Sequence, residues 1–336
     1  MSSAMLRIVS AVSALTGAIM LSGAVLAQSG FPVKPIRIIV PYPPGGTVDL
    51  VGRTIGMVLA QQIGQQVVVE NRVGASGTIG ADFVSKAAPD GYTLLVNASL
   101  QVFNQYIMKS LPFDPIKDFT HISLIGSVQL LATAAANFPA NNLAELIALA
   151  RANPGKYSFA TSGIGSASHL AEEMVKRQAG IDMLIVVYKG AAPALTDVMG
   201  GQVSAMIDAL PASYPHVKSG RLKALAVTGR NRASFLPDVP TAAESGLPGF
   251  EISSWYGLWA PAKLPADVTA RLAAEIVKAV RSKEVKDRLE AQSFEPSGIS
   301  GAEFMNHIDK EVATISKLIR EANIKVERGS RGLTLR

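Results

Sequence analysis

Short apolar segments with strand character alternate with helical patterns along most of the chain, and this alternation constrains the fold more than any other feature. The strand-like run 36–42 is followed by apolar residues at helical spacing between Val48 and Leu59. Strands that alternate with helices predict a mainly parallel α/β fold, in which ligands bind beyond the carboxyl ends of the strands. Later strands are predicted at 121–135, 157–162, 183–190, 203–210, 222–229 and 253–261.

The amino-acid composition limits which classes of protein and which kinds of site are possible. The 336 residues are 48% hydrophobic and 17% charged, which predicts a large buried core rather than disorder. The net charge of +6 is not gathered into a basic stripe interleaved with aromatic residues, so a nucleic acid partner is not expected. Cysteine is absent, and this excludes disulfides, thiolate metal sites, cysteine nucleophiles and a lipoprotein anchor.

The N-terminus has the pattern of an export signal. Arg7 is the one charge before the apolar run 8–26, which ends in Val25-Leu26-Ala27. We expect a signal peptide over residues 1–27, with cleavage after Ala27 and a periplasmic location in a Gram-negative cell. A membrane anchor is the competing interpretation, because the run is nearly long enough to span a bilayer.

Two loops at strand ends have the residue types of an anion-binding cradle. In VPYPPGGTVDL, residues 40–50, glycines Gly45 and Gly46 leave the backbone bare just before a helix begins. In ATSGIGSASH, residues 160–169, hydroxyls and backbone N–H groups precede another helix. Both loops could hold a carboxylate without a cationic side chain, and the alternatives are an ordinary tight turn and ordinary helix capping.

Enzyme motifs are incomplete in this chain. The segment GIGSA places Gly165 where a nucleophile elbow needs serine, and Ser168 occupies the third glycine position of the dinucleotide fingerprint. No glycine-rich loop supplies the lysine of a phosphate-binding loop, and the four histidines have no metal-ligand spacing. For His169, helix packing or a ligand hydrogen bond outweighs a catalytic pair with Ser166. The sequence predicts no catalytic residue, metal or cofactor.

A family resemblance extends over nearly the whole chain from Phe31 to about Glu327. The segments that carry it are RIIVPYPPGGTVDLVGR, VVVENRVGASGTIGADFVSKAAPDGYTLLV, LPFDPIKDFTHISLIG, SGIGSASHLAEE, VYKGAAPALTDVMGGQV, SGRLKALAVTGRNRASFLPDVPTAAESGLPGFE and WYGLWAPAKLP. In these segments the chain resembles the Bug family, the periplasmic solute receptors of tripartite tricarboxylate transporters.

The resemblance implies a two-lobed periplasmic binding protein of type II, a "Venus flytrap" with a mainly parallel sheet in each lobe. It implies two crossings between the lobes, near 125–133 and 222–228. The expected organisation is lobe 1 in residues 28–126 and 227–328, lobe 2 in residues 127–226, and a basic tail at 329–336.

The resemblance also implies a function and a site. The protein is expected to be a receptor and not an enzyme, capturing a di- or tricarboxylate, an amino acid or an aromatic acid for the permease subunits of a tripartite tricarboxylate transporter. Two alternatives stay open, namely a sensor that presents its closed form to a membrane signalling partner and a secreted hydrolase. The far end of the ligand is expected to meet Asn97, Ser99, Gln101, Lys189 and Asp208. The other candidate ligand-binding residues are Tyr42, Pro43, Gly45, Gly46, Thr47, Asp49, Ser162, Gly163, Gly165, Ser166 and His169.

Overall fold

The computed structural model describes residues 30–291 and 294–321, and the chain divides into two compact units, residues 1–33 and 34–336. Every described helix and strand lies in the second unit. The predicted signal peptide with its cleavage after Ala27, and the predicted tail at 329–336, lie outside the described residues.

Lobe 1 is built on a mixed sheet with the strand order β2-β1-β3-β9-β4, and β10 pairs with the other edge of β4. Strand β1 pairs parallel with β2 and β3, whereas β9 pairs antiparallel with both β3 and β4. The strands are β1 (Ile36–Val40), β2 (Val67–Asn71), β3 (Thr93–Ala98), β4 (Phe119–Ala135), β9 (Ser253–Pro261) and β10 (Phe294–Ser300).

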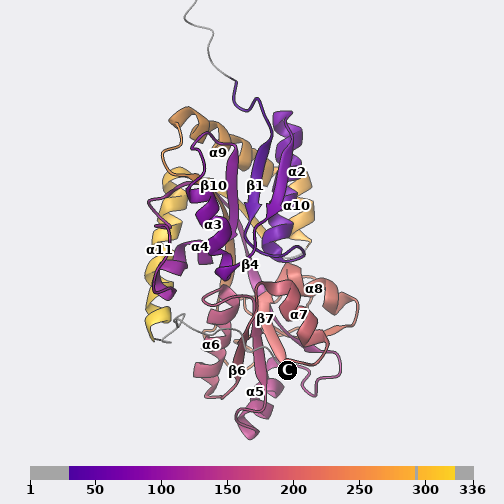
Figure 1. The fold of residues 1–336 in the computed structure, drawn as a ribbon. Coiled ribbons are helices and arrows are strands. Elements are labelled where there is room, and N and C mark those ends of the chain that lie inside the picture. Colours follow the sequence, from indigo (N-terminus) through magenta and orange to yellow (C-terminus); the bar gives the residue numbers. More distant parts are fainter. Residues whose placement is uncertain (1–29, 292–293, 322–336) are drawn as a thin grey trace, which may run out of the picture. The chain divides into compact units, whose positions relative to one another are not determined.

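Lobe 2 is built on a second sheet that shares the long strand β4 (Figure 1). Residues 119–129 of β4 pair with β9 in lobe 1, and residues 130–134 pair antiparallel with β7 in lobe 2. Strand β5 pairs parallel with β6 and β7, and β8 pairs antiparallel with β4. These strands are β5 (Ser158–Thr161), β6 (Leu184–Val187), β7 (Ala205–Ala209) and β8 (Leu222–Val227).

Helices pack on both sheets. Helix α2 packs against β1 and β2 and also contacts α9 and α10, while α6 packs against β5 and β7. The helices of lobe 1 are α2 (Thr47–Ile63), α3 (Thr78–Ser85), α4 (Leu100–Ile107), α9 (Ala266–Arg281), α10 (Lys283–Glu290) and α11 (Gly301–Glu321), with a 3-10 turn η1 (Ala75–Gly77). Those of lobe 2 are α5 (Leu143–Ala152), α6 (Ala167–Ala179), α7 (Ala191–Met199) and α8 (Leu210–Lys218).

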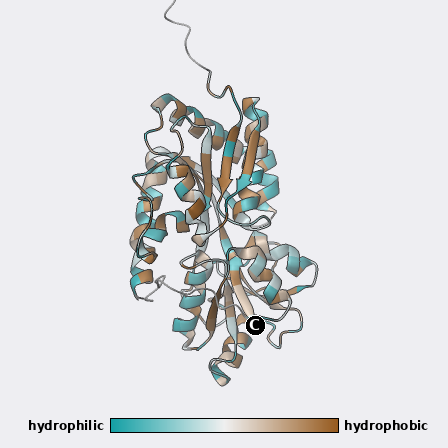
Figure 2. Ribbon diagram, in the orientation of Figure 1, coloured by the Kyte–Doolittle hydropathy of each residue, from teal (hydrophilic) through white to brown (hydrophobic). Residues whose placement is uncertain are grey.

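The core lies between the sheets and the helices that cover them, and the central strands are its most hydrophobic part (Figure 2). Both tryptophans of β9, Trp255 and Trp259, are buried. Each indole N–H has a partner, because Trp259 donates to His121 Nδ1 at 2.8 Å and Trp255 donates to Glu311 Oε2 at 3.2 Å. Burial therefore leaves neither donor unsatisfied.

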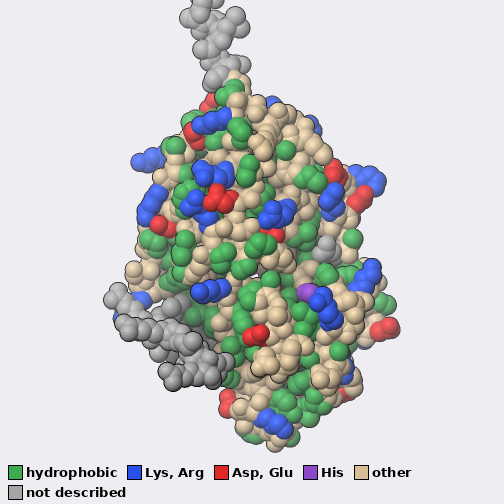
Figure 3. All heavy atoms as spheres, turned by 45° about the vertical axis from the view of Figure 1, so that its right-hand side comes forward, with side chains coloured by type: hydrophobic (Ala, Val, Ile, Leu, Met, Phe, Trp, Pro, Cys, Tyr) green, Lys and Arg blue, Asp and Glu red, His purple; other side chains and the backbone are tan. Residues whose placement is uncertain are grey.

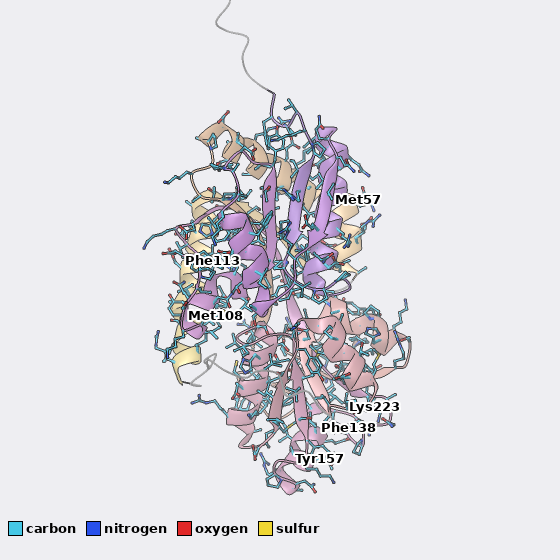
Figure 4. All side chains as sticks on the ribbon, in the orientation of Figure 1. Met57, Met108, Phe113, Phe138, Tyr157 and Lys223 are labelled. Atoms are coloured by element: carbon cyan, nitrogen blue, oxygen red, sulfur yellow. The ribbon has the colours of Figure 1, made fainter. Side chains whose placement is uncertain are left out.

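A smaller cluster lies in lobe 2. The ring of Phe138 packs edge-on against Tyr157 at a centroid distance of 5.6 Å, and the Lys223 ammonium donates to the Phe138 carbonyl at 2.8 Å. Figure 4 labels all three residues in this lobe. The cluster ties β8 to the segments that follow β4 and precede β5.

The strands predicted at 121–135, 203–210, 222–229 and 253–261 are present with similar bounds as β4, β7, β8 and β9. Helix α4 and strand β10 were not predicted, and neither was the antiparallel pairing around β4. The alternating pattern carries no information on that pairing, because partners such as Leu131 and Asp208 lie far apart in the sequence. Among the described residues, no helix combines the length and apolar character needed to cross a membrane.

Candidate functional site

A cavity of about 60 Å³ lies where helices α2, α4, α6, α7 and α8 begin. This volume is several times the roughly 10–15 Å³ that one ordered water needs. Each of the five helices directly follows a strand, in the pairs β1–α2, β3–α4, β5–α6, β6–α7 and β7–α8. The cavity thus lies beyond the carboxyl ends of strands from both sheets, where the sequence predicted a ligand.

Both lobes line the cavity. Lobe 1 and the crossing strand β4 contribute Tyr42, Pro43, Gly46, Thr47, Val48, Ala98, Ser99, Leu100, Leu130, Ser254 and Tyr256. Lobe 2 contributes Ser162, Ser166, Ala167, Ser168, Gly190, Ala191, Asp208 and Ala209. The lining combines backbone, hydroxyl groups and apolar surface, and among the described lining residues there is no lysine or arginine.

The first predicted loop is held in shape by Asp49 from outside the cavity. Its carboxylate accepts hydrogen bonds from Gly45 N–H at 3.1 Å, Arg53 Nε at 3.0 Å and Asn71 Nδ2 at 2.9 Å. Burial alone would raise the pKa of Asp49, but these hydrogen bonds and the Arg53 charge outweigh it and lower the pKa. Since Asn71 also donates to the Tyr42 carbonyl at 2.9 Å, the loop is fixed at both ends.

The start of helix α2 presents unoccupied polar groups to the cavity. Gly46 is the N-cap and provides no side-chain hydrogen bond to the first turn. The hydroxyl of Thr47 is buried and makes no hydrogen bond of standard geometry in the described chain, although it lies within electrostatic range of Tyr256. Backbone N–H groups at a helix start together with a buried hydroxyl favour an anion.

The second predicted loop is organised by Ser166, the N-cap of α6. Its hydroxyl donates to the Gly163 carbonyl at 2.7 Å and accepts from the backbone N–H of His169 at 3.2 Å. Ser162 donates to Asp208 Oδ1 at 3.1 Å, which joins this loop to the end of β7. Helix capping thus occupies Ser166, and Ser162 points its hydroxyl toward a carboxyl group.

His169 supports the loop and does not form a catalytic pair with Ser166. Its Nδ1 accepts the backbone N–H of Gly165 at 2.9 Å. Burial, together with the nearby positive charge of Lys176, lowers the pKa of His169 to about 4, so the ring is neutral at pH 7.

Asp208, Tyr42 and Tyr256 are the ionisable side chains among the described lining residues. Burial raises the pKa of Asp208 to about 7, although hydrogen bonds from Ala209 N–H and Ser162 act in the opposite direction. Burial also raises the pKa of both tyrosines, which are therefore neutral donors at pH 7. Charged side chains of both signs are instead intermixed over the outer face that Figure 3 shows.

The structure brings together part of the predicted set. Those that line the cavity are Tyr42, Pro43, Gly46, Thr47, Ser99, Ser162, Ser166 and Asp208. Those outside the lining are Gly45, Asp49, Asn97, Gln101, Gly163, Gly165, His169 and Lys189. Lys189 is exposed, and Asn97 donates to Gln101 Oε1 at 3.0 Å within the core of lobe 1.

Other lining residues were not predicted. Gly190 and Ala191 lie in the same strand-end loop as Lys189, but only Lys189 was predicted from this loop. The start of helix α7 at Ala191 could have indicated that the backbone there contacts a ligand. Tyr256, on β9, also lines the cavity. Leu130 comes from the crossing strand β4, and no local sequence signal marks it. Within the described ranges, no three histidine, aspartate or glutamate side chains are grouped as a metal site would require.

Comparison with known proteins identifies the family. Residues 51–324 match the family model of the tripartite tricarboxylate transporter family receptor. Protein BugT of Bordetella pertussis is 36% identical over 299 residues, which cover 88% of this chain and 92% of BugT.

Solved structures agree with this match. The R. palustris protein Rpa4515, solved with adipate, superposes with a TM-score of 0.85 at 34% identity and covers 88% of this chain and 100% of its own. MatC from Rhodopseudomonas palustris, solved with bound malate, gives a TM-score of 0.80 at 31% identity, covering 86% of this chain and 100% of its own. Together with the strand-end cavity shared by two lobes, these matches show that the chain belongs to the tripartite tricarboxylate transporter receptor family, the periplasmic solute receptors that include the Bug proteins.

Proposed function

We propose that this protein captures a small organic carboxylate in the cavity between its lobes. The observation that carries the proposal is the meeting of five helix starts at a cavity whose described lining has no cationic side chain. Helix starts stabilise an anion through their free N–H groups and dipoles. Relatives solved with adipate and with malate support the same ligand class.

The binding groups are assigned from the lining. Thr47, Ser99 and the backbone from Gly46 to Val48 bind from lobe 1, and the backbone start of α7 binds from lobe 2, while the Ser162 hydroxyl donates its hydrogen bond to Asp208. The predicted residues Gly45, Asp49, Gly163, Gly165 and His169 act by holding the two loops in shape.

The proposed cellular role follows the family. The chain is exported by a leader, residues 1–27, works in the periplasm, and hands its ligand to the permease subunits of a tripartite tricarboxylate transporter. It binds without catalysing a reaction. Residues 28–126 and 227–328 move as lobe 1 and residues 127–226 as lobe 2, and closure of the lobes on the ligand follows from contacts made by both.

A thermal-shift screen of the purified protein against mono-, di- and aromatic carboxylates tests the binding proposal. A ligand at 100 times its dissociation constant should add about 2.7 kcal/mol to the free energy of unfolding, which raises the melting temperature. Gly46→Leu should abolish that shift, because a Cβ at Gly46 already lies 3.9 Å from the Ala191 side chain and a longer chain fills the cavity.

Lys189→Ala is the matched control, since this exposed lysine lies outside the lining. Its ligand-induced shift should equal that of the unmodified protein. If no carboxylate stabilises folded, ligand-stripped protein, or if Gly46→Leu binds as well as the unmodified protein, the proposed site is wrong.

A further inference from the structure

Asp208 brings a carboxyl group to the wall of a cavity that otherwise favours anions. It is the penultimate residue of β7, is only 6% exposed, and lines the cavity next to Ala209. Its Oδ1 accepts a hydrogen bond from Ser162 at 3.1 Å, and the Ala209 N–H also hydrogen-bonds this carboxyl group. A carboxyl group in this position constrains which part of a ligand can lie beside it.

The surroundings of Asp208 provide no opposite charge. The ionisable groups within electrostatic range are the Tyr42 hydroxyl from the loop before α2, the Tyr256 hydroxyl from β9 and the Glu172 carboxyl from α6. All three are acids that supply no positive charge, Tyr256 and Glu172 being buried and Tyr42 half-buried, and no lysine or arginine is among the described lining residues. A second negative charge beside Asp208 would therefore meet no counter-ion.

The two ends of a ligand consequently face different requirements. The start of α2, with its backbone N–H groups and the buried Thr47 hydroxyl, offers hydrogen-bond donors to one carboxylate. An ionised Asp208 offers only acceptors, so a hydroxyl group beside it gains a hydrogen bond. A second carboxylate beside it would be repelled strongly, because both charges lie in a largely dehydrated cavity.

We propose that Asp208 makes the site selective for carboxylates that carry a hydrogen-bond donor, such as a hydroxyl group, at the position facing it, and against ligands that place a second ionised carboxylate there. This inference rests on the proposed function and specifies its ligand class. A dicarboxylate then binds only with one proton shared between its far carboxylate and Asp208.

The protonation of Asp208 also predicts how the affinity for a dicarboxylate depends on pH. Because the pKa of Asp208 is about 7, the side chain is increasingly protonated below that pH and becomes a donor itself. The affinity for a dicarboxylate should therefore rise as the pH falls from 8 to 6, whereas the affinity for the matching hydroxy acid should change little.

Isothermal titration calorimetry with matched ligand pairs tests this selectivity. The pairs are adipate with 6-hydroxyhexanoate and succinate with 4-hydroxybutanoate, each measured at pH 6 and pH 8. At pH 8 we expect the hydroxy acid of the better-fitting pair to bind at least about tenfold more tightly than the dicarboxylate. Asp208→Asn should reduce this ratio to below about threefold and remove the pH dependence of dicarboxylate binding.

Asp182→Asn is the matched control, because it changes an exposed aspartate of the same lobe. It should leave the affinity ratio of the two ligands and the pH dependence of dicarboxylate binding unchanged. Ser162→Ala provides a second variant if Asp208→Asn fails to fold. Removing its hydrogen bond should raise the pKa of Asp208 and move the pH midpoint of dicarboxylate binding upward.

The outcomes separate this inference from the proposed function. A dicarboxylate that binds as tightly as its hydroxy acid at pH 8, or a ratio unchanged by Asp208→Asn, overturns the role of Asp208 and leaves a carboxylate receptor. Failure of both ligand classes to bind the folded, ligand-stripped protein overturns both proposals.

Discussion

At the scale of single residues, Glu172 is an acid whose charged form the fold disfavours. It is completely buried on α6, and its Oε1 accepts hydrogen bonds from Ser168 Oγ and Ile207 N–H, both at 3.2 Å. Its Oε2 is buried without a hydrogen bond of standard geometry in the described chain. Burial raises the pKa of Glu172 well above its ordinary value of 4.5, and the nearby Asp208 adds to the effect.

Glu172→Gln should therefore change how stability depends on pH. The unfolded chain releases its proton near pH 4.5, whereas the folded protein releases it only at a higher pH, so the free energy of unfolding falls as the pH rises between the two pKa values. Glutamine cannot titrate and preserves the shape of the neutral acid, so the variant should lose less stability between pH 5 and pH 8. Urea unfolding at both pH values measures the difference.

Glu303→Gln serves as the comparison for this test, since Glu303 is exposed near the start of α11. Its stability curve should run parallel to that of the unmodified protein. A Glu172→Gln curve that is also parallel would show that Glu172 is ionised in the folded state.

At the scale of secondary-structure elements, Thr228 joins the two crossings between the lobes. Its hydroxyl accepts from Leu130 N–H on β4 at 2.8 Å and donates to the Ile252 carbonyl, just before β9, at 2.7 Å. Its own N–H donates to the Leu130 carbonyl at 3.0 Å. One buried side chain thus links β4, the end of β8 and the start of β9 where the chain passes between the sheets.

Thr228→Val should destabilise the fold, because valine has nearly the same shape but leaves Leu130 N–H and the Ile252 carbonyl without the hydroxyl. Leaving a buried donor unsatisfied costs about 1–3 kcal/mol. The loss is measured as the free energy of unfolding in urea. Thr228→Ser keeps the hydroxyl and should retain most of the stability, so equal losses in the two variants would contradict the assignment.

At the scale of the whole molecule, the lobes approach each other through glycines of lobe 2. A Cβ on Gly165 would overlap the Ile107 side chain of α4 and lie 3.3 Å from Leu100 Cδ1. A Cβ on Gly163 would lie 3.5 Å from the Ser76 hydroxyl. The contact between the lobes beside the cavity therefore depends on backbone without side chains.

Gly165→Ala should hinder closure of the lobes and weaken ligand binding at least about tenfold, because binding shifts the lobes toward the form in which they touch. Calorimetry measures the affinity, and small-angle scattering measures whether a ligand still makes the molecule more compact. Since Gly165 lies outside the cavity lining, the variant leaves the binding groups in place.

Gly180→Ala is the control that distinguishes an effect on lobe closure from an effect of backbone strain. Gly180 has a φ of 62° and Gly165 a φ of 74°, so alanine is similarly strained at both, but a Cβ on Gly180 meets no atom within 4 Å. Gly180→Ala should bind as tightly as the unmodified protein, and adding Ile107→Ala to Gly165→Ala should restore part of the affinity. Equal binding by the two single variants would show that this contact does not control closure.

The positions of the two loops follow from local sequence. Pro43, Gly45 and Gly46 stand between a strand and a helix, and Ser166 stands where a helix needs an N-cap. Such signals act over a few residues, so they are visible without a structure. The chemical reason to expect a bare backbone cradle, namely hydroxyls and glycines with few cations, was visible there too.

The direction of individual side chains was not visible in this way. Asp49 and Asp208 look alike in the sequence, since each lies at the junction of a strand and a helix. Asp49 turns away to Arg53 and to Asn71 on β2, whereas Asp208 faces the cavity beside Ser162. Lys189 was an equally reasonable candidate, but its side chain lies in solvent.

By itself, the sequence determined the α/β class, the places where strands meet helices and the family to which the chain belongs, because these depend on short-range periodicity, turn residues and motifs. The tertiary structure alone decided that β4 runs through both sheets, that Leu130 and Tyr256 face the cavity, and that Asp208 lies in a wall without a counter-ion. These features depend on pairings between residues far apart in the chain, such as Leu131 with Asp208, and on burial that only the packed lobes create.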